Sequence, residues 1–307
     1  MTTMSEEYNP LVSVAVITYN SAKTVIETLE SIHNQTYQNL ELIISDDCSK
    51  DDTVSICRDW VATHEDRFVR TEIITAPQNT GVTANYKRAS ENCRGEWIKE
   101  IDGDDLLLPD CLKIYMQYIK DHPESIYLFG KVEVFGTNLE KVNDFADRIF
   151  DNSFFFLPQE QQYEWLITRL SQPIASVTSF YNKEKVDKLG IVYDIRIPML
   201  EDWPRWIQLA EKGVEFHFVD TVIAKYRVSG DVSICSGTVY TSSFMRSLAL
   251  MYIYYQYIPA QKFLGKRKAW ARYVECQKRV SESKLWSVLY ALIQFLLLPK
   301  KMLKRMK

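Results

Sequence analysis

The sequence has few of the features that mark zinc-binding, disulfide-stabilised or nucleic-acid-binding proteins. Its six cysteines include no C-x-x-C pair and form no compact framework, and its four histidines are scattered without the spacing of a zinc site. The N-terminus carries no signal peptide, so we expect reduced cysteines and a cytosolic protein. The net charge of −3 gives no reason to expect nucleic acid as a partner.

Internal repeats and low-complexity segments are also absent from the sequence. An apolar run from Leu285 to Leu298 is broken by Ser287 and Gln294, and it is short for a membrane-spanning helix of about 20 residues. Basic residues fill five of the last eight positions. The pattern favours a helix lying on an anionic inner membrane surface, with a docking helix and a solvated basic end as the alternative.

What the sequence does contain is an alternation of strands and helices. The composition is ordinary for a globular protein, and 307 residues are ample for a large core. Short apolar runs indicate buried strands, and amphipathic segments between them indicate helices. This alternation predicts an α/β fold, with a doubly wound, mostly parallel sheet flanked by helices. The four predicted strands of the first hundred residues are Val12–Thr18, Leu40–Ser45, Phe68–Ile74 and Trp97–Ile101.

Polar residues follow three of these strands, where an open α/β sheet binds its ligands. They are Tyr19–Asn20, Asp46–Asp47 and Asp102–Asp105. The last group places three carboxylates within four residues, so they repel one another unless a cation lies between them. Carboxylate oxygens suit Mg²⁺ or Mn²⁺, which commonly bridge a protein to phosphate oxygens. We therefore expect a divalent-metal site for a phosphorylated ligand; an acidic surface turn is the alternative.

The second half of the chain is less regular. Pro109 should open a helix to about Asp121, and a second helix should run from Pro204 to about Lys212. Residues 138–160 are expected to be mobile, with a lid as one option. The predicted strands are Ile126–Gly130, Lys131–Phe135, Val177–Tyr181, Glu215–Val219 and Val222–Arg227, before a helical C-terminal region.

Five segments in order resemble the nucleotide-binding half of glycosyltransferase family 2, which has the GT-A fold. They are Val14–Asn20, Ser31–Tyr37, Leu42–Ser49, Asn79–Gly81 and Ile101–Asp105. The resemblance implies a GT-A domain over residues 1–235, with a nucleotide-binding half at 10–120 and an acceptor half at 121–235. Residues 236–307 then form a helical C-terminal extension with a basic tail. Cys48 departs from the family, which usually has Gly or Asn there.

The resemblance implies a nucleoside-diphosphate sugar as donor. Tyr19 would lie against the base, and Asp47 would accept a hydrogen bond from the base N3–H, which favours uracil or thymine. Asp102 is placed for the ribose or the metal, and Asp104 for the metal that bridges the diphosphate. Asn79 and Asn85 are possible donor contacts, with turn and cap roles as alternatives.

A second acidic pair, Glu201–Asp202, resembles the pair that precedes an acceptor-side helix in the family. It implies Asp202 as the general base and Glu201 as a neighbour that shapes the site; the alternative is that Asp202 caps the helix. Arg227 is a candidate to steady the diphosphate, or an arginine that ends an exposed strand. Trp203 and Trp206 either stack on a sugar or pack in the core.

Together these features predict an inverting, Mn²⁺- or Mg²⁺-dependent glycosyltransferase. It would move a sugar from a nucleotide donor, UDP-sugar by the Asp47 argument, to a glycan or lipid-linked acceptor in polysaccharide biosynthesis. We expect it in the cytoplasm, peripheral on the inner face of the membrane. One rival is a nucleotidyltransferase, which needs a Gly-rich loop after the first strand; Tyr19–Lys23 has no glycine. The other is a non-catalytic nucleotide-sugar-binding module, which needs no base.

Overall fold

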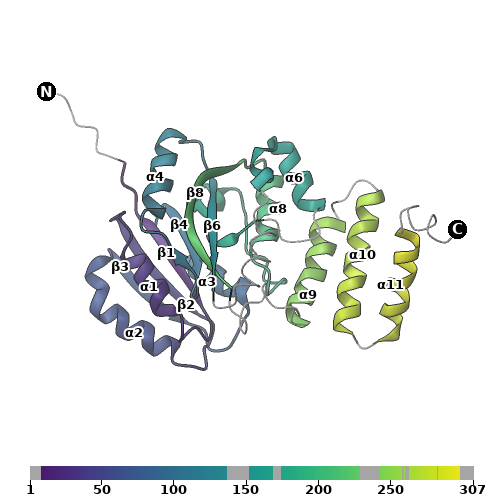
Figure 1. The fold of residues 1–307 in the computed structure, drawn as a ribbon, viewed down its shortest axis with the longest axis horizontal. Coiled ribbons are helices and arrows are strands. Elements are labelled where there is room, and N and C mark those ends of the chain that lie inside the picture. Colours follow the sequence, from purple (N-terminus) through teal and green to yellow (C-terminus); the bar gives the residue numbers. More distant parts are fainter. Residues whose placement is uncertain are drawn as a thin grey trace.

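The computed structural model describes residues 8–136, 152–168, 174–228, 242–257, 259, 263–281 and 283–297. Figure 1 shows a sheet with helices around it and a row of further helices that extends away toward the C-terminus. Within the described residues the sheet has the strand order β3-β2-β1-β4-β7-β6-β8-β5. The strands are Val12–Thr18 (β1), Leu40–Asp46 (β2), Arg70–Thr75 (β3), Trp97–Asp102 (β4), Leu106–Leu107 (β5), Tyr127–Phe135 (β6), Phe180–Asn182 (β7) and Phe216–Arg227 (β8).

The first four strands form the parallel half of the sheet. β1 pairs in parallel with β2 and β4, and β2 with β3. The connecting helices are α1 (Val25–His33), α2 (Thr53–His64) and α3 (Val82–Asn92). Every residue of β1 and β2 is buried, as their continuous apolar runs predict for strands covered on both faces.

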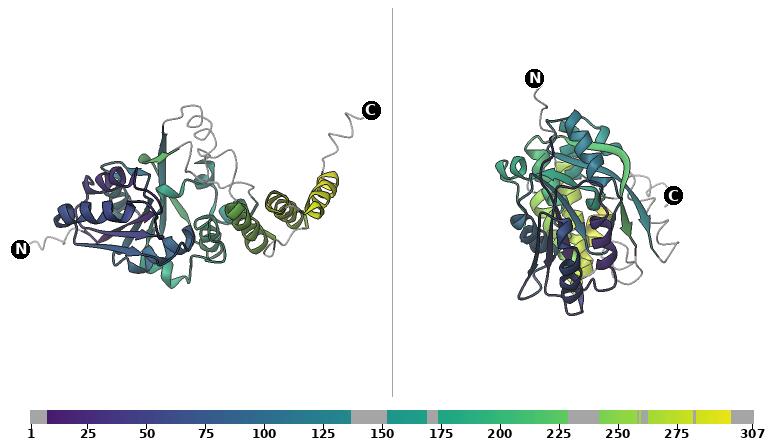
Figure 2. Two further views of the ribbon diagram at one scale, coloured as in Figure 1. Left: turned by 90° about the horizontal axis from the view of Figure 1, so that it is seen from below. Right: turned by 90° about the vertical axis from the view of Figure 1, so that its left-hand side faces the viewer.

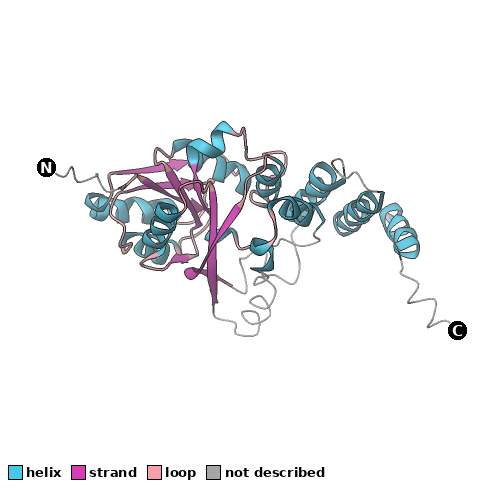
Figure 3. Ribbon diagram, turned by 90° about the horizontal axis from the view of Figure 1, so that it is seen from above, coloured by secondary structure: helices cyan, strands magenta, loops and turns pink. Residues whose placement is uncertain are grey.

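Helices cover both faces of this sheet (Figure 3). Because successive side chains of a strand point to opposite faces, β1 supplies both cores. Ala15 and Ile17 belong to one apolar cluster, and Val14 and Val16 to the other. The doubly wound arrangement predicted from the sequence is therefore confirmed.

The second half of the sheet is mixed. β6 and β8 are parallel, β7 is antiparallel to β4 and β6, and β5 is antiparallel to β8. β6 and β8 each replace two predicted strands, because their pairing continues past a register shift between Gly130 and Val132. The predicted strand Val177–Tyr181 was wrong at its start, where Ser176–Thr178 form a 3-10 helix before β7.

The other helices of the domain complete the two layers, and one of them, η2 (Asn152–Phe156), contains Phe154. Phe154 is fully buried and packs on Phe216, so part of the segment predicted to be mobile, residues 138–160, belongs to the core. Residues 138–151 of that segment lie outside the described residues. The helices are η1 (Glu65–Arg67), α4 (Cys111–Asp121), η2 (Asn152–Phe156), α6 (Gln159–Thr168), η3 (Ser176–Thr178), α7 (Lys183–Lys188) and α8 (Trp203–Glu211).

The C-terminal extension is helical, as predicted. It contains α9 (Ser242–Met251), a π-helix (Tyr252–Tyr257), α10 (Phe263–Val280) and α11 (Lys284–Leu297). In Figure 2 these helices follow one another away from the sheet, with α10 packed on α9 and α11 on α10. In the part of the chain that the structure describes, no helix is long and apolar enough to cross a membrane. The predicted boundary at residues 235 and 236 and the basic tail lie outside that part.

Candidate active site

The polar residues after β1, β2 and β4 meet at one edge of the sheet, as the sequence predicts. In the strand register Ile17 is opposite Asp102, and Thr18 is opposite Asp46. The Thr18 hydroxyl donates to Asp46 at 3.0 Å and so ties the ends of β1 and β2 together. The loops that follow β1, β2 and β4 therefore lie side by side along one edge of the sheet, which we call the rim.

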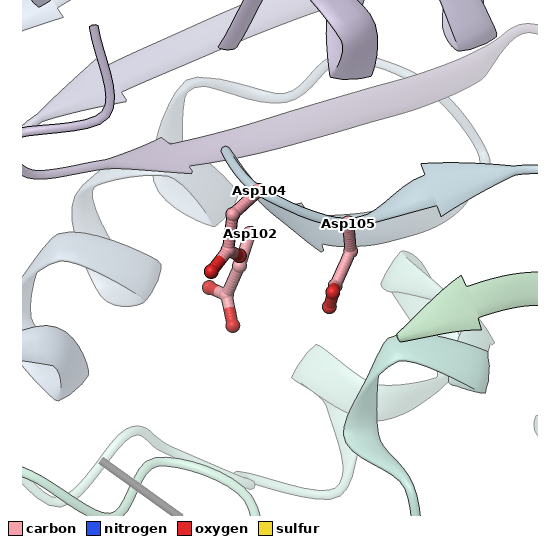
Figure 4. Close-up of side chains that lie close together, drawn as sticks. All are labelled: Asp102, Asp104 and Asp105. Carbon is pink, nitrogen blue, oxygen red and sulfur yellow. The ribbon is translucent and has the colours of Figure 1, made fainter. Parts of the chain in front are cut away.

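Three carboxylates, those of Asp102, Asp104 and Asp105, lie together at this rim (Figure 4). One oxygen of each lies within 4.8 Å of the others. Asp105 Oδ1 accepts the Arg227 N–H at 2.8 Å, whereas Asp105 Oδ2 is buried and has no hydrogen-bond partner among the described residues. An oxygen-only set with a buried oxygen left over fits a hard divalent cation.

Burial and neighbouring charges raise the pKa values of the carboxylates in this cluster. Burial, with the neighbouring Asp104 carboxylate, raises the pKa of Asp102 to about 7. Burial and the charges of Asp104 and Asp102 raise the pKa of Asp105 well above its usual range. The pKa of Asp104 is also raised by burial, against the opposing effect of the Arg227 cation. A bound dication would relieve this repulsion.

The second acidic pair, Glu201 and Asp202, lies at the start of α8. Asp202 Oδ1 accepts the Trp203 N–H at 2.5 Å, so the helix-cap role considered for Asp202 is confirmed. Burial raises the pKa of Asp202 to about 7. Burial also raises the pKa of Glu201, with contributions from Asp202 and Asp102. The charge of Asp202 also contributes to the raised pKa of Asp102, so the two acidic groups act on each other electrostatically although more than ninety positions separate them in sequence.

Both tryptophans beside this pair are core residues, so of the two roles considered for them core packing is confirmed and stacking on a sugar is excluded. Trp203 and Trp206 are 0% and 1% exposed. Trp203 Nε1 donates to the Leu166 carbonyl at 3.0 Å, and Trp206 packs edge-on against Phe129. Their packing fixes α8 and hence the position of Asp202.

Asp47 holds the turn that precedes α3. Its carboxylate accepts the N–H groups of Thr80 and Gly81, both at 2.8 Å, and the Thr80 hydroxyl at 2.5 Å. Arg88 adds an ion pair at 3.0 Å. Each Asp47 oxygen thus already accepts two hydrogen bonds, which is about the capacity of a carboxylate. Asn85, which donates to the Thr18 carbonyl at 3.1 Å and accepts from Arg88 at 2.8 Å, is buried.

Tyr19 and Asn79 are the exposed members of the predicted set. Tyr19 is 45% exposed directly after β1, and Asn79 lies exposed in the turn held by Asp47. Cys48, between these two turns in sequence, has φ 66°, a left-handed conformation that favours Gly or Asn. The left-handed backbone therefore suits the Gly or Asn that is usual at this position better than it suits Cys48.

Arg227 ends β8 beside the acidic cluster. Its Nε donates to the Asp104 carbonyl at 2.7 Å, and its Nη2 forms an ion pair with Glu27 at 2.8 Å. The guanidinium carbon also lies 4.4 Å from the centre of the Phe135 ring. The predicted cation therefore lies beside the acidic cluster, in contact with the backbone of Asp104.

Two contacts of the site were missed in the sequence. The Tyr86 hydroxyl donates to Asp102 Oδ1 at 2.8 Å, and Arg88 neutralises Asp47. Both side chains come from α3, which directly follows the turn that contains Asn79 and Gly81. The available signal was their spacing of one and three residues from Asn85 and the positive charge of Arg88, but this signal does not say which strand end each side chain reaches.

Comparison with known proteins identifies the family. Residues 13–188 match the model of glycosyl transferase family 2. A putative glycosyltransferase of Bacillus subtilis, EpsE, is 32% identical over 45% of this chain, and the match spans 46% of EpsE. TuaG of the same organism, named as a putative teichuronic acid biosynthesis glycosyltransferase, is 24% identical over 72% of this chain and 80% of its own.

Solved structures support the same fold. Staphylococcus aureus TarS in complex with UDP-GlcNAc matches 89% of this chain and 74% of its own, with a TM-score of 0.61 and 20% identity. A mannosyltransferase of Pyrobaculum calidifontis in complex with GDP-Man and Mn²⁺ has a TM-score of 0.60 and 18% identity, and the match covers 96% of this chain and 82% of the mannosyltransferase chain. These likenesses establish the GT-A fold, and the family match covers more than half of the sequence. The chain belongs to glycosyl transferase family 2.

Proposed function

We propose that this chain is an inverting glycosyltransferase that uses a nucleoside-diphosphate sugar, with a divalent metal bound at the acidic cluster. One observation carries the proposal: two acidic groups, Asp102–Asp105 and Glu201–Asp202, come from opposite halves of the fold and lie close enough for their charges to act on each other. A transferase of this kind needs one group for the leaving diphosphate and another for the attacking hydroxyl.

The metal belongs with the first group. Asp104 and Asp102 would hold Mn²⁺ or Mg²⁺, and the bound ion would neutralise charge on the diphosphate. Among the described residues around the site, carboxylates outnumber cationic side chains, which supports a bound dication as the balancing charge. The acidic side chains are Glu100, Asp102, Asp104, Asp105, Glu201 and Asp202, against Lys99, Arg205 and Arg227.

Asp202 would accept the proton of the acceptor hydroxyl. As that oxygen forms its bond to the anomeric carbon, the bond to the diphosphate breaks and the diphosphate leaves with the electron pair. A pKa of about 7 for Asp202 suits a base that works near neutral pH. A single displacement turns an α-linked donor into a β-linked product.

The nucleotide contacts follow from the rim. Exposed Tyr19 would lie against the base, exposed Asn79 and the Asp102 carboxylate would contact the donor, and Arg227 would turn toward the diphosphate from its pair with Glu27. Asp47 would bond the N3–H of uracil. Because its oxygens are already occupied, that bond replaces one now made, and the Thr80 hydroxyl is the donor that can rotate away.

The relatives support the donor and product classes. TarS has been solved with UDP-GlcNAc and the mannosyltransferase with GDP-Man and Mn²⁺, so nucleotide sugars bind on this fold. TuaG is named for teichuronic acid biosynthesis. We propose a UDP-sugar as donor, a glycan or lipid-linked saccharide as acceptor, and polysaccharide biosynthesis as the setting.

A cytoplasmic location on the inner membrane face is part of the proposal. α11 exposes Leu285, Val288 and Leu292, at 61%, 55% and 54%, on positions three and four residues apart. Such spacing puts them on one side of the helix. The basic residues that follow in the sequence would attract anionic lipid, and together the two features suit peripheral contact.

The rival functions are less well supported. A nucleotidyltransferase cradles a triphosphate in a Gly-rich loop after the first strand, and here that loop is Tyr19–Lys23, without glycine. A non-catalytic binding module does not need a buried carboxyl with a pKa of about 7 near the acidic cluster. Asp202 is such a carboxyl.

The test is a panel of donors with the whole chain. UDP-glucose, UDP-galactose, UDP-N-acetylglucosamine and GDP-mannose are each incubated with Mn²⁺, and the release of nucleoside diphosphate is measured with water as acceptor. We expect release from a UDP-sugar that stops when EDTA is added. Release of pyrophosphate from UTP and a sugar phosphate would favour the nucleotidyltransferase, and donor binding without any release would favour the binding module.

A further inference from the structure

A buried ion pair lies behind the acidic cluster and joins β4 to α8. Glu100 stands two residues before Asp102, and Arg205 stands three residues after Asp202. Arg205 Nη1 lies 3.6 Å from Glu100 Oε2, and the two side chains are 5% and 6% exposed. Neither side chain is open to solvent or to a bound donor. Buried charges of this kind are costly unless each is paired and hydrogen-bonded.

The hydroxyl of Tyr193 completes the link between the two charges. It accepts from Arg205 Nη1 at 2.8 Å and donates to Glu100 Oε1. Tyr181 donates to the same Glu100 oxygen at 2.8 Å. The Arg205 guanidinium carbon lies 4.2 and 4.3 Å from the ring centres of Tyr181 and Tyr193, so two aromatic faces hold it in place.

This cluster also contacts Tyr86, the residue that hydrogen-bonds Asp102. The Tyr193 ring lies 6.2 Å from the ring of Tyr86, whose hydroxyl donates to Asp102 Oδ1. Tyr193 itself stands in the segment that leads into Glu201. The same few side chains therefore connect the carboxylate at the end of β4 with the one at the start of α8.

We propose that Arg205 is a positioning residue that sets the separation between Asp202 and Asp102. Through Tyr193 and Glu100 it fixes the first turn of α8 against the end of β4. A single nitrogen of the guanidinium, Nη1, contacts both the Tyr193 hydroxyl and the Glu100 carboxylate. This inference rests on the proposed function, because it matters only if both carboxylates act on one reaction.

A simpler role must be distinguished from positioning. Arg205 would also stabilise the fold by neutralising the buried charge of Glu100, whatever reaction the site performs. A role in stability alone changes the melting temperature and leaves the turnover of folded protein unchanged. A positioning role changes kcat, because a displacement of about 1 Å costs up to about 10²-fold in rate.

The first test is Tyr193→Phe, which removes the bridging hydroxyl and keeps the ring. Tyr118→Phe is the control, because that hydroxyl contacts His217 on another part of the sheet. Nucleoside diphosphate release is measured with the donor of the panel that the wild type hydrolyses fastest. We expect kcat to fall by about tenfold or more, with unchanged donor KM and unchanged calorimetric affinity for UDP with Mn²⁺.

The second test is the double variant Glu100→Gln with Arg205→Met, which leaves no buried charge unpaired. Positioning predicts a melting temperature close to that of the wild type and a kcat that stays low. Wild-type kcat in the double variant, or in Tyr193→Phe, would overturn the inference and leave the proposed function intact. Absence of release by the wild type from every donor would overturn the proposed function and the positioning role with it.

Discussion

Asp202→Asn separates the proposed catalytic role of Asp202 from its structural role. Asp202 caps α8 by accepting the Trp203 N–H through Oδ1, and the amide oxygen of Asn accepts the same bond. Asn and Asp are about equally good caps, whereas Ala at such a position costs about 1 kcal/mol. The fold and its melting temperature should therefore change little.

Turnover should change much more. The amide cannot take the proton of the acceptor hydroxyl, and a positioned general base contributes typically ~10²–10⁴-fold. At ~1.4 kcal/mol for each tenfold step, the expected loss is about 3–5 kcal/mol of transition-state stabilisation. Metal and donor binding should not weaken, because the charge of Asp202 helps to raise the pKa of Asp102. Removing that charge lowers the pKa of Asp102 and leaves more of it ionised near pH 7.

The assay pairs the initial rate of nucleoside diphosphate release with calorimetry of UDP and Mn²⁺. Asp59→Asn, at an exposed position of α2, is the matched control. A rate close to that of the wild type would refute the reasoning and leave Asp202 as a helix cap only. Glu201 would then be the next candidate for the base.

Three further predictions follow from the same geometry. Asp104→Ala should abolish Mn²⁺-dependent binding of UDP by calorimetry, since it removes an anionic ligand from the metal; unchanged affinity would show that the metal lies elsewhere. The pKa of Asp102 and Asp202 is about 7 in the folded state and near 4 when unfolded, so these groups make the metal-free chain less stable as pH rises from about 4 to 7. Mn²⁺ needs the ionised carboxylates, so it should raise the melting temperature more at pH 7.5 than at pH 5.5; an equal rise would contradict the site. Deleting residues 285–307 should abolish co-sedimentation with anionic vesicles, and equal sedimentation before and after would favour a helix that docks on the protein.

The parallel half of the sheet was predictable because local signals agreed there. β1 begins and ends where the apolar pattern predicts, and the polar ends of β1, β2 and β4 meet as expected. The second half was harder, because long-range pairing decides it. Nothing in the residues around Gly130 shows that β6 continues through its register shift beside β8.

The site was predictable where its residues follow a strand or open a helix. Asp102, Asp104 and Asp202 stand at such positions, and the structure brings them together. The residues behind them were not predictable. Glu100 lies next to Lys99 in the sequence, and only the fold reveals that Arg205, more than a hundred positions later, is its partner. Trp203 and Trp206 were ambiguous for the same reason, since burial is a property of the whole packing.

The anomeric configuration of the first product tests the central claim most directly. The chain is mixed with Mn²⁺ and the α-linked UDP-sugar that it hydrolyses, and the released sugar is followed by proton NMR from the first minutes, before its anomers equilibrate. A single displacement assisted by Asp202 predicts that the β-anomer appears first. If the α-anomer appears first, the inverting mechanism and the role of Asp202 as its base are both contradicted.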